Sequence, residues 1–405
     1  MMRALEIRRF GRMEKRSAGR LLRPEKSMKI LFVMDEFFAP NNGLSISAQR
    51  FTAELRARGH DVRVLAGDVC GVPEFPLPEF RVPIFDGLIK RQGMSFARAD
   101  DAKIEAAVRW ADVVHLEDCF VVAGHAARIA GRLGKPCTGA FHLYPENITS
   151  SIGLQWAVPV NDAILVGFRD YVFRYCSDIH CPTQDVADRL LRRGYTARLH
   201  VISNGVSDQF PFRREEKPAP YRDRFVVLAV GRFSREKRQD VLIRAAAESK
   251  YRDRIQLVFA GQGPLEGRYR RMARRLPNAP EFRFMSQAEL ADAMARADLY
   301  VHAAETEVEG MSCMEGMSSG LVPVIADSPR SSSRHFAPDG RCLFPSGDAD
   351  ALRQRLEYWL EHEPERRAME RLCSERAQEN SVKNSAAKLE RMFLEACREG
   401  GGHEA

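Results

Sequence analysis

Short apolar segments alternate with amphipathic stretches from Met28 onward, and this alternation runs through the chain twice. Such a pattern is typical of parallel α/β sheets with helices on both faces. Residues 207–224, a polar stretch with three prolines, separate the two series and indicate an interdomain linker. The pattern predicts an α/β protein with two Rossmann-like, doubly wound domains that face a central cleft.

The same alternation sets the predicted domain boundaries. Residues 28–206 form the first domain, residues 225–362 form the second, and the charged residues 363–405 are expected to add helices, able to pack back on the first domain, and a short tail. Strands are expected near residues 29–34, 61–66, 80–84, 112–116, 136–141, 178–181, 199–202, 225–230, 255–260, 281–285, 298–303, 322–325 and 341–344. Helices are expected near residues 45–58, 100–110, 121–133, 161–176, 184–193, 239–249, 265–275, 287–296, 312–319 and 349–361. Ligands of open α/β sheets bind at the carboxyl ends of the strands, so the cleft between the domains is the predicted site.

The first 27 residues carry most of the net charge of +7. They hold nine Lys and Arg against three Glu, so the remaining 378 residues sum to only +1. Proteins that bind DNA or RNA concentrate cations on the folded binding face, and we therefore expect no nucleic-acid partner. Residues 1–27 are interpreted as a disordered upstream extension or a mis-assigned start, with a basic arm for anionic lipid as the alternative.

Nine cysteines without a C-x-x-C pair fit neither a zinc site nor a disulfide framework, which favours a reducing compartment. The basic start lacks the apolar run of a signal peptide, and no later segment has the roughly 18 to 20 apolar residues of a membrane-spanning helix. The predicted location is the cytoplasm, either free or in peripheral contact with the inner face of the membrane.

Two cations follow the first strand of the second domain. Arg232 and Lys237 lie five positions apart in the loop that begins at Gly231. A planar Arg fork and a mobile Lys can clamp a diphosphate, whereas a solvated charged loop is the alternative interpretation.

A second loop precedes the helix expected at 312–319. Gly310 would let a phosphate approach the free N–H groups at the start of this helix. Ser312 and Glu315 have the spacing of a capping box, and Glu315 could both cap the helix and face the cleft. Glu307 has no comparable capping role.

Three carboxylates are crowded in this loop, at Glu305, Glu307 and Glu309. They would repel one another unless water or the hydroxyl groups of a ligand solvate them. A hydroxyl-rich ligand such as a sugar fits this requirement.

In the first domain, two residues are expected to face the cleft. Gly43, in Pro40-Asn41-Asn42-Gly43, lies between the first strand and its helix, where a glycine lets a ligand approach the backbone. His142 follows the strand expected at 136–141. A structural role is the alternative for His142, as it is for His115.

Residues 151–176 are rich in Ile, Leu, Val, Trp and Phe, with Asn161-Asp162 as the expected helix cap. The composition favours an ordinary buried helix pair. The alternative is an apolar wall or membrane-facing helix for a lipid substrate.

Two further motifs are interpreted as structural. Gly261-Gln262-Gly263-Pro264 superficially resembles a dinucleotide fingerprint, but its spacing and its place after the second strand of the domain argue against a nicotinamide oxidoreductase. Asp348 and Asp350 could be a metal-binding pair, but Asp348 fits a helix N-cap better. We expect no metal and no cofactor.

Taken in order, the motifs resemble those of the retaining GT-B glycosyltransferases of family 4, the group 1 type. The resemblance covers about residues 28–362 and rests on Gly231-Arg232 with Lys237, Gly261-x-Gly263-Pro264, Glu307-x7-Glu315, Gly320-x-x-Pro323-Val324 and Asn204-Gly205-Val206. It implies a GT-B enzyme that moves a hexose from a nucleotide-diphosphate sugar, in the first instance a UDP-sugar, to a hydroxyl of a lipid or saccharide, as in glycolipid or polysaccharide synthesis.

The resemblance also implies roles for single residues. Arg232 and Lys237 would hold the diphosphate, and Glu315 the ribose hydroxyls. Glu307 would contact the transferred sugar and its phosphate together with the backbone of Gly310, Met311 and Ser312.

Three more roles follow from the family. Met285 would contact the base through its backbone, Gly43 would lie near the phosphate, and His142 would border the reacting sugar. The implied mechanism is front-face transfer, in which the leaving phosphate helps to deprotonate the acceptor and no metal is needed.

The chain departs from the family pattern at Glu309, where an aromatic residue is usual. Because the loop is expected to face the donor sugar, this departure bears on which sugar is bound. The run Val322–Ser331 is faintly similar to enzymes that glucosylate diacylglycerol. A nucleotide-sugar-binding protein of the same fold without turnover, acting as a partner or regulatory subunit, is the alternative function.

Overall fold

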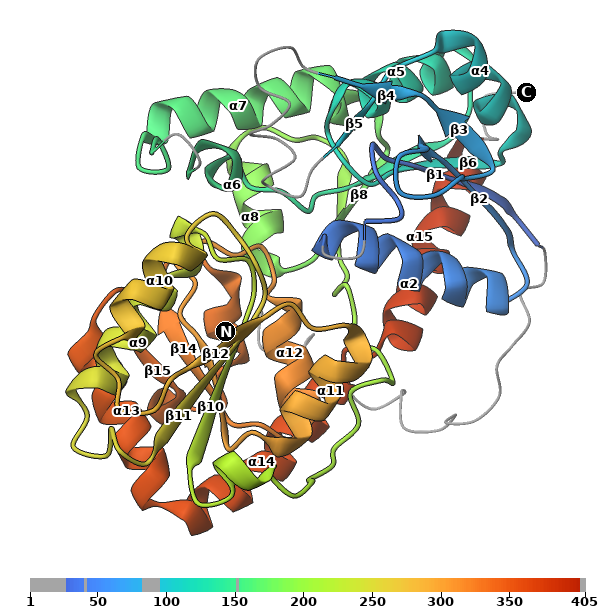
Figure 1. The fold of residues 1–405 in the computed structure, drawn as a ribbon. Coiled ribbons are helices and arrows are strands. Elements are labelled where there is room, and N and C mark those ends of the chain that lie inside the picture. Colours follow the sequence, from blue (N-terminus) through green and yellow to red (C-terminus); the bar gives the residue numbers. More distant parts are fainter. Residues whose placement is uncertain (1–26, 40–41, 82–94, 151–152, 401–405) are drawn as a thin grey trace, which may run out of the picture.

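The computed structural model describes residues 27–39, 42–81, 95–150 and 153–400 of the 405-residue chain. The extension at residues 1–26, Pro40 and Asn41 of the glycine loop, and the tail after residue 400 lie outside the described residues. Two α/β domains lie next to each other, the first coloured blue to green and the second yellow to orange (Figure 1). This is the predicted fold class.

The first domain is built on seven parallel strands in the order β3-β2-β1-β6-β7-β8-β9. Their bounds are β1 Lys29–Val33, β2 Asp61–Gly67, β3 Phe75–Leu77, β6 Val113–Leu116, β7 Cys137–Ala140, β8 Asp178–Cys181 and β9 Arg198–Val201. A small antiparallel pair, β4 Glu79–Phe80 and β5 Phe96–Ala97, lies beside them. Every residue of β6, β7 and β8 is buried, as expected for parallel strands covered on both faces.

The second domain repeats this plan with six parallel strands in the order β12-β11-β10-β13-β14-β15. Their bounds are β10 Phe225–Val230, β11 Ile255–Ala260, β12 Glu281–Arg283, β13 Leu299–His302, β14 Pro323–Asp327 and β15 Leu343–Pro345. In both sheets the strand order reverses beside the first strand, so both domains have a switch point at their carboxyl edge.

Helices cover both faces of each sheet. In the first domain they are α2 Gly43–Ala57, α4 Asp101–Trp110, α5 Val121–Arg132, α6 Pro145–Thr149, α7 Val158–Tyr171 and α8 Gln184–Arg192. In the second they are α9 Gln239–Glu248, α10 Glu266–Ala273, α11 Gln287–Arg296, α12 Met311–Ser318 and α13 Ala349–Glu361, followed by α14 Glu363–Gln378 and α15 Val382–Gly400.

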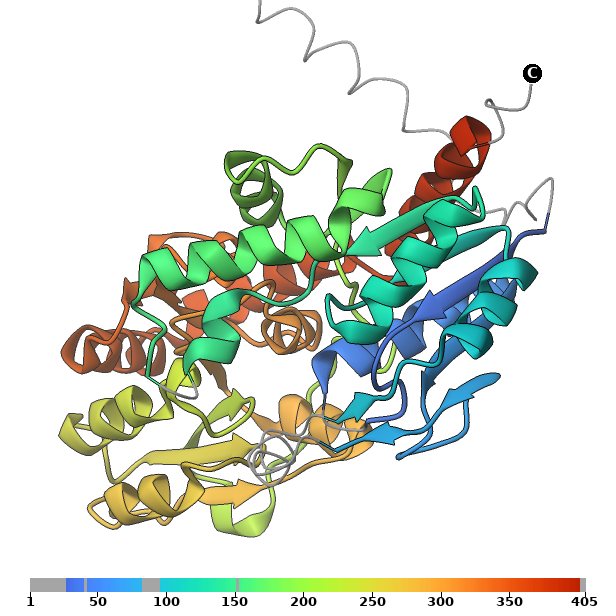
Figure 2. The same cartoon turned by 90° about the horizontal axis from the view of Figure 1, so that it is seen from above.

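The last helix returns to the first domain. Both views place α15 against the blue and teal elements of that domain (Figures 1 and 2). Leu389, Met392 and Phe393 of α15 are buried in one apolar cluster with Ile30 and Phe32 of β1. The C-terminal helix therefore completes the core on one face of the first sheet.

The chain crosses between the domains twice, and the two crossings are hydrogen-bonded to each other. The Val206 N–H donates to the Asn380 carbonyl at 2.8 Å, and the Val382 N–H donates to the Val206 carbonyl at 3.0 Å. Gly205 has φ +80°, and a Cβ there would lie 2.6 Å from the Val382 Cα, so the close approach of the two crossings needs a glycine.

Three local predictions differ from the structure or lie partly outside it. Strands β3 and β4 lie at residues 75–80, and residues 82–84 of the strand expected near 80–84 lie outside the described residues. The helix expected at 161–176 begins at Val158, so Asn161-Asp162 is not its cap; Asn161 is instead buried, and its side chain accepts from the Thr149 hydroxyl at 2.8 Å. The strand expected at 281–285 ends at Arg283 because the chain leaves the sheet edge there.

Candidate active site

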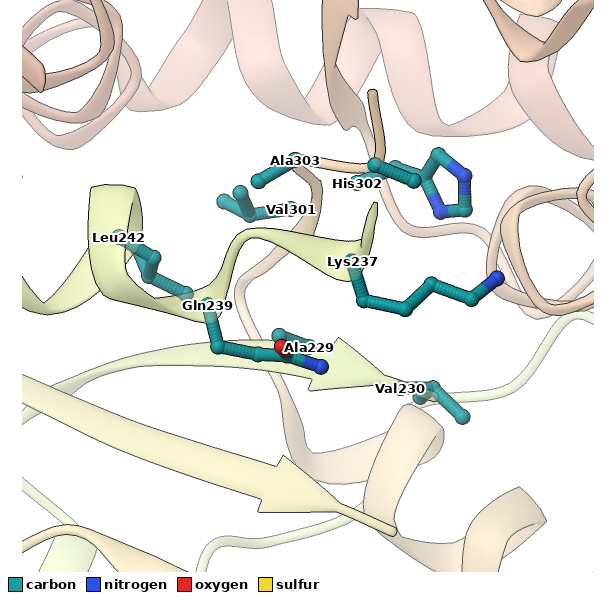
Figure 3. Close-up of a pocket in the computed structure, with 9 residues that line it drawn as sticks. Ala229, Val230, Lys237, Gln239, Leu242, Val301, His302 and Ala303 are labelled. Carbon is teal, nitrogen blue, oxygen red and sulfur yellow. The ribbon is translucent and has the colours of Figure 1, made fainter. Parts of the chain in front are cut away.

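A pocket lies at the carboxyl ends of β10 and β13, in the second domain. Its lining includes Ala229 and Val230 from β10, Lys237 from the following loop, and His302 and Ala303 from the end of β13. Figure 3 shows Lys237 and His302 extending in the same direction, beyond the end of the strand that carries Val230. The structure therefore puts the predicted lysine at the predicted edge of the sheet.

Arg232 and Lys237 each face a carboxylate. The Arg232 guanidinium is 3.0 Å from Glu236 Oε1, and Lys237 pairs with Glu307 of the second loop. Burial raises the pKa of Glu307, but the Lys237 ammonium, together with His302, more than offsets this and holds the pKa below its ordinary value. The two predicted loops thus meet through opposite charges.

His302 lies behind this pair. Its Nε2 is 3.7 Å from Glu307 Oε2 and 3.2 Å from the Ser333 hydroxyl. Burial lowers the pKa of His302 to about 4, so the ring is neutral at physiological pH and lets Lys237 dominate the local charge. His302 was missed at the sequence level, although a polar residue at the end of an otherwise apolar strand was a usable signal.

The start of α12 has the backbone expected of an anion site, but the capping box is wrong. Gly310 is the N-cap residue, with φ +82°, and a Cβ there would lie 2.2 Å from the Ser333 hydroxyl oxygen. Ser312 therefore lies inside the helix, where its hydroxyl accepts from the Tyr300 hydroxyl at 2.9 Å. Within the described residues, no side chain caps the first-turn N–H groups at Met311 and Ser312.

Glu315 is freed from capping and contacts the first domain. Its Oε1 is 2.7 Å from Arg50 Nη2 of α2, and Arg50 also donates to Gln287 at 2.9 Å. Burial outweighs the Arg50 charge and raises the pKa of Glu315. Arg50 was not identified from the sequence, because its partner lies 265 positions away along the chain.

The three crowded carboxylates do not need a polyol to separate them, because each has its own protein partners. Glu305 lies 3.6 Å from Arg238 and 3.5 Å from Arg330, and Glu307 pairs with Lys237. This corrects the prediction that the carboxylates would repel one another unless water or ligand hydroxyl groups solvated them.

Glu309, the departure from the family pattern, is buried at the crossing between the domains. Its Oε2 accepts from the Asn204 N–H at 2.9 Å. The prediction that this departure bears on which sugar is bound stays a prediction.

The first domain supplies Gly43 opposite the start of α12. Gly43 is the first residue of α2, and a Cβ there would lie 3.3 Å from Met311 Cε. Asn42 caps the helix by accepting from the Leu44 N–H at 3.0 Å. The predicted glycine and the predicted helix start therefore face each other across the domain boundary.

His142 follows β7 at the carboxyl edge of the first sheet. Its Nε2 lies 3.1 Å from Glu117 Oε2, and its ring packs edge-on against His180 with the ring centroids 5.1 Å apart. Nearby Thr183, after β8, donates to Ser332 of the second domain at 3.0 Å. His142 is thus placed at the edge that the second domain covers, and Glu117 was not identified from the sequence.

Met285 is buried in the loop two residues beyond β12, at the far edge of the second sheet. This is the carboxyl side on which a base contact was predicted. Asp348 caps α13 by accepting from the Ala351 N–H at 2.9 Å, as predicted. Among the residues that the structure describes, no group of three or more His, Cys, Asp and Glu side chains could hold a metal ion.

The expected buried helix pair in residues 151–176 is wrong. Only Asn161 and Leu165 of α7 are buried, whereas Trp156, Val158 and Val160 are 57%, 62% and 42% exposed. Trp156 packs under Arg330 of the second domain, whose guanidinium carbon is 3.7 Å from the ring centroid. The apolar residues that composition assigned to a core therefore form a surface at the edge of the first domain, where Figure 1 shows α7. No helix in the described ranges is both long and apolar enough to cross a membrane.

Two family models match the chain, one on each domain. Residues 41–210 match the model described as Glycosyltransferase Family 4, and residues 212–376 match that of Glycosyl transferases group 1. Together they extend over most of both sheets and every predicted site residue.

Curated relatives and solved structures agree with the family models. The chain is 28% identical over 320 residues to a GDP-mannose-dependent alpha-mannosyltransferase of Corynebacterium glutamicum, covering 75% of this chain and 73% of the relative. It is 24% identical over 319 residues to the alpha-monoglucosyldiacylglycerol synthase of Streptococcus pneumoniae, covering 74% and 71%. The fold is similar to that of the Anabaena protein HepE solved with UDP-glucose, with a TM-score of 0.70 at 17% identity over 91% of this chain and all of the other.

Proposed function

The chain belongs to the group 1 glycosyltransferases, and from this premise we propose that it transfers a hexose, with retention of configuration, from a UDP-sugar to a hydroxyl group of a lipid acceptor. The observation that carries the proposal is the junction of Lys237, Glu307 and the uncapped start of α12 at one edge of the second sheet. This junction offers a cation, a carboxylate and backbone donors to one ligand, the combination that a sugar diphosphate requires.

In the proposed reaction, charge develops on the leaving phosphate. The bond between the anomeric carbon and the phosphate oxygen breaks, a bond from that carbon to the acceptor oxygen forms on the same face, and the acceptor proton passes to the phosphate. Arg232, Lys237 and the N–H groups at the start of α12 would stabilise the phosphate charge. No protein base or metal ion is needed for this proton transfer.

The carboxylates have separate proposed roles. A bound diphosphate would compete with Glu307 for Lys237, leaving the Glu307 carboxylate to accept hydrogen bonds from the transferred sugar. Arg50 contacts Oε1 of Glu315, and we assign Oε2 to the ribose hydroxyls. Because Arg50 belongs to the first domain, ribose binding would be coupled to the contact between the domains.

The lipid acceptor is proposed from α7 and the loop before it. Leu154, Trp156, Val158 and Val160 are exposed, and Arg330 lies against Trp156 at the domain boundary. Exposed apolar side chains beside a cation suit the interface of a membrane. The similarity to a protein named alpha-monoglucosyldiacylglycerol synthase fits the same acceptor class.

The experiment that tests this function begins with donor binding. The purified protein is heated with UDP, GDP, ADP and their hexose conjugates, and we expect a selective rise in melting temperature with one UDP-hexose. A rise with GDP-mannose alone would overturn the choice of base. No rise with any donor would contradict the proposed donor site, whereas a rise without transfer in the next assay would favour a nucleotide-sugar-binding partner without turnover.

Transfer is then measured with diacylglycerol vesicles and with soluble saccharides, in buffer with and without EDTA. We expect a new α-linked glycolipid, identified by the anomeric coupling in NMR spectra, at an unchanged rate in EDTA. Arg232→Ala should lower the rate, whereas Arg244→Ala, an equal loss of charge at an exposed position of α9, should not. Transfer only to soluble saccharides would overturn the lipid acceptor. A β-linked product would overturn the proposed retention of configuration.

A further inference from the structure

A buried cluster of titratable groups lies beneath His142 in the first domain. His115 lies in β6, Glu117 follows in the next loop, and His180 lies in β8. All three side chains are fully buried. Glu117 Oε2 is 3.1 Å from His142 Nε2, and Glu117 Oε1 is 3.5 Å from His115 Nε2. A carboxylate at this depth is costly unless a proton donor faces it.

His115 is not that donor. Its Nε2 is 3.5 Å from Glu117 Oε1, beyond ordinary hydrogen-bond distance, and has no hydrogen-bond partner among the described residues. Its Nδ1 lies 2.8 Å from the Thr138 hydroxyl instead. Burial lowers the pKa of His115 to about 3, which keeps the ring neutral.

His180 is also excluded as the donor. Its Nε2 is 2.6 Å from the Ile202 carbonyl oxygen, which can only accept, so the ring proton is on Nε2 and points away from Glu117. Burial lowers the pKa of His180 to about 3. Across the described residues, neither the Glu117 oxygens nor His142 Nε2 makes a hydrogen bond of good geometry, so the buried carboxylate has no donor in place. The 3.1 Å separation of Glu117 Oε2 from His142 Nε2 is shorter than the 3.5 Å to His115, so a small rotation of the His142 ring would bring its N–H into line.

From this elimination we infer that Glu117 is a positioning residue, which holds the proton of His142 on Nε2 and so leaves the Nδ1 lone pair of His142 for a hydroxyl of the transferred hexose. The ring of His180 packs edge-on against His142 and fixes its plane. A ring held in this tautomer accepts a hydrogen bond from the sugar, and the nearby carboxylate favours positive charge on the reacting carbon. The inference rests on the proposed function for the identity of the ligand, but not for the tautomer.

The tautomer is measured first, on the full-length protein without any donor. Long-range proton–nitrogen NMR correlations of the His142 ring, assigned with His142→Gln, should show the proton on Nε2. In Glu117→Gln the amide can either donate or accept, so we expect a mixture of the two tautomers. A wild-type ring with its proton on Nδ1 would overturn the inference, whatever the activity of the protein.

Kinetics then separate positioning from a structural role. Glu117→Gln should lower kcat about 10- to 100-fold while the KM for the donor changes less than about threefold. In the His142→Ala background the same change should cost no further activity, because Glu117 acts through that ring. Equal losses in both backgrounds would contradict the inference.

Two further variants protect the test against misfolding. Thr138→Val removes an equally buried hydrogen bond to His115 and should lower stability without lowering kcat. Glu117→Asp keeps the charge but shortens the reach, and should retain an intermediate kcat. If wild-type protein transfers no sugar from any donor, the proposed function fails, and the NMR result alone decides the inference.

Discussion

The two domains share one architecture but place charge in opposite ways at their carboxyl edges. The second domain offers partly exposed ion pairs, Lys237 with Glu307 and Arg232 with Glu236. The first domain offers a buried cluster in which His115 and His180 are held neutral around Glu117. The charged edge of the second domain suits a diphosphate. The buried edge of the first domain, with its neutral histidines, suits the hydroxyl groups and transient charge of a reacting sugar. The loops after the strands, rather than the fold, set this difference.

Glu309 of the second domain contacts Asn204 at the crossing between the domains. The titration of Glu309 should have the largest effect of all, on the free energy of unfolding. Burial raises its pKa to about 7, against the hydrogen bonds from Ser203 and Asn204 that lower it. Such a group stabilises the fold fully below its unfolded pKa, near 4.5, and loses this contribution as the pH rises through 7. Relative to Glu309→Gln, the wild type should lose about 3 kcal/mol of stability between pH 4.5 and pH 8.

Urea midpoints of the two proteins at pH 5 and pH 8 check this prediction. The difference between variant and wild type isolates Glu309 from the histidines that also titrate. The same difference in urea midpoint between the variant and the wild type at pH 5 and at pH 8 would show that the Glu309 carboxyl group is not desolvated.

Lys237→Ala should break the charged edge. It removes a charge-assisted contact to the diphosphate worth about 2 to 3 kcal/mol, so donor affinity and kcat/KM should fall about 30- to 150-fold. Calorimetric titration with the best donor measures the affinity. Lys250→Ala, a cation 60% exposed in the same domain, is the control and should bind normally. Unchanged donor binding by Lys237→Ala would contradict the assignment of the diphosphate to this loop.

His142→Ala changes the buried edge of the first domain and should lower turnover more than donor binding. We expect kcat to fall about tenfold or more with donor affinity within about threefold, because the ring acts on the reacting sugar rather than on the nucleotide. Single-turnover rates and donor titrations measure the two quantities. Equal losses in both would assign His142 a structural role only.

Trp156→Ala should give the smallest effect and sharpen the acceptor assignment. If α7 is the proposed lipid-binding surface, losing one exposed aromatic there should raise the apparent KM for lipid several-fold and leave the KM for the donor unchanged. Leu372→Ala, an exposed apolar residue on α14 of the second domain, is the matched control. Equal effects of both variants would argue against α7 as the acceptor surface.

The sequence predicted the two sheets and the edge at which the site lies. Local apolar runs define each strand, and chain order places every loop at a known end of a parallel sheet. Gly43, Lys237, Gly310 and Glu315 were placed at that edge because the loops after parallel strands lie there.

The wrong predictions depend on contacts between elements that are far apart in the sequence. Ser312 and Glu315 have capping-box spacing, but the left-handed Gly310 starts the helix one residue earlier and Tyr300 takes the Ser312 hydroxyl. The apolar run in 151–176 resembles a core helix, yet burial depends on what packs against a helix and not on its composition.

By itself, the sequence determined the fold class, the site edge and the family of the chain, because these depend on periodicity and on short motifs whose members are neighbours along the chain. Only the tertiary structure decided which charges meet. Arg50 with Glu315, Asn204 with Glu309, and Glu117 with His142 are pairs whose members come from different elements. Such pairs form because each buried or half-buried charge must find a partner in the folded chain, and sequence spacing does not specify which one.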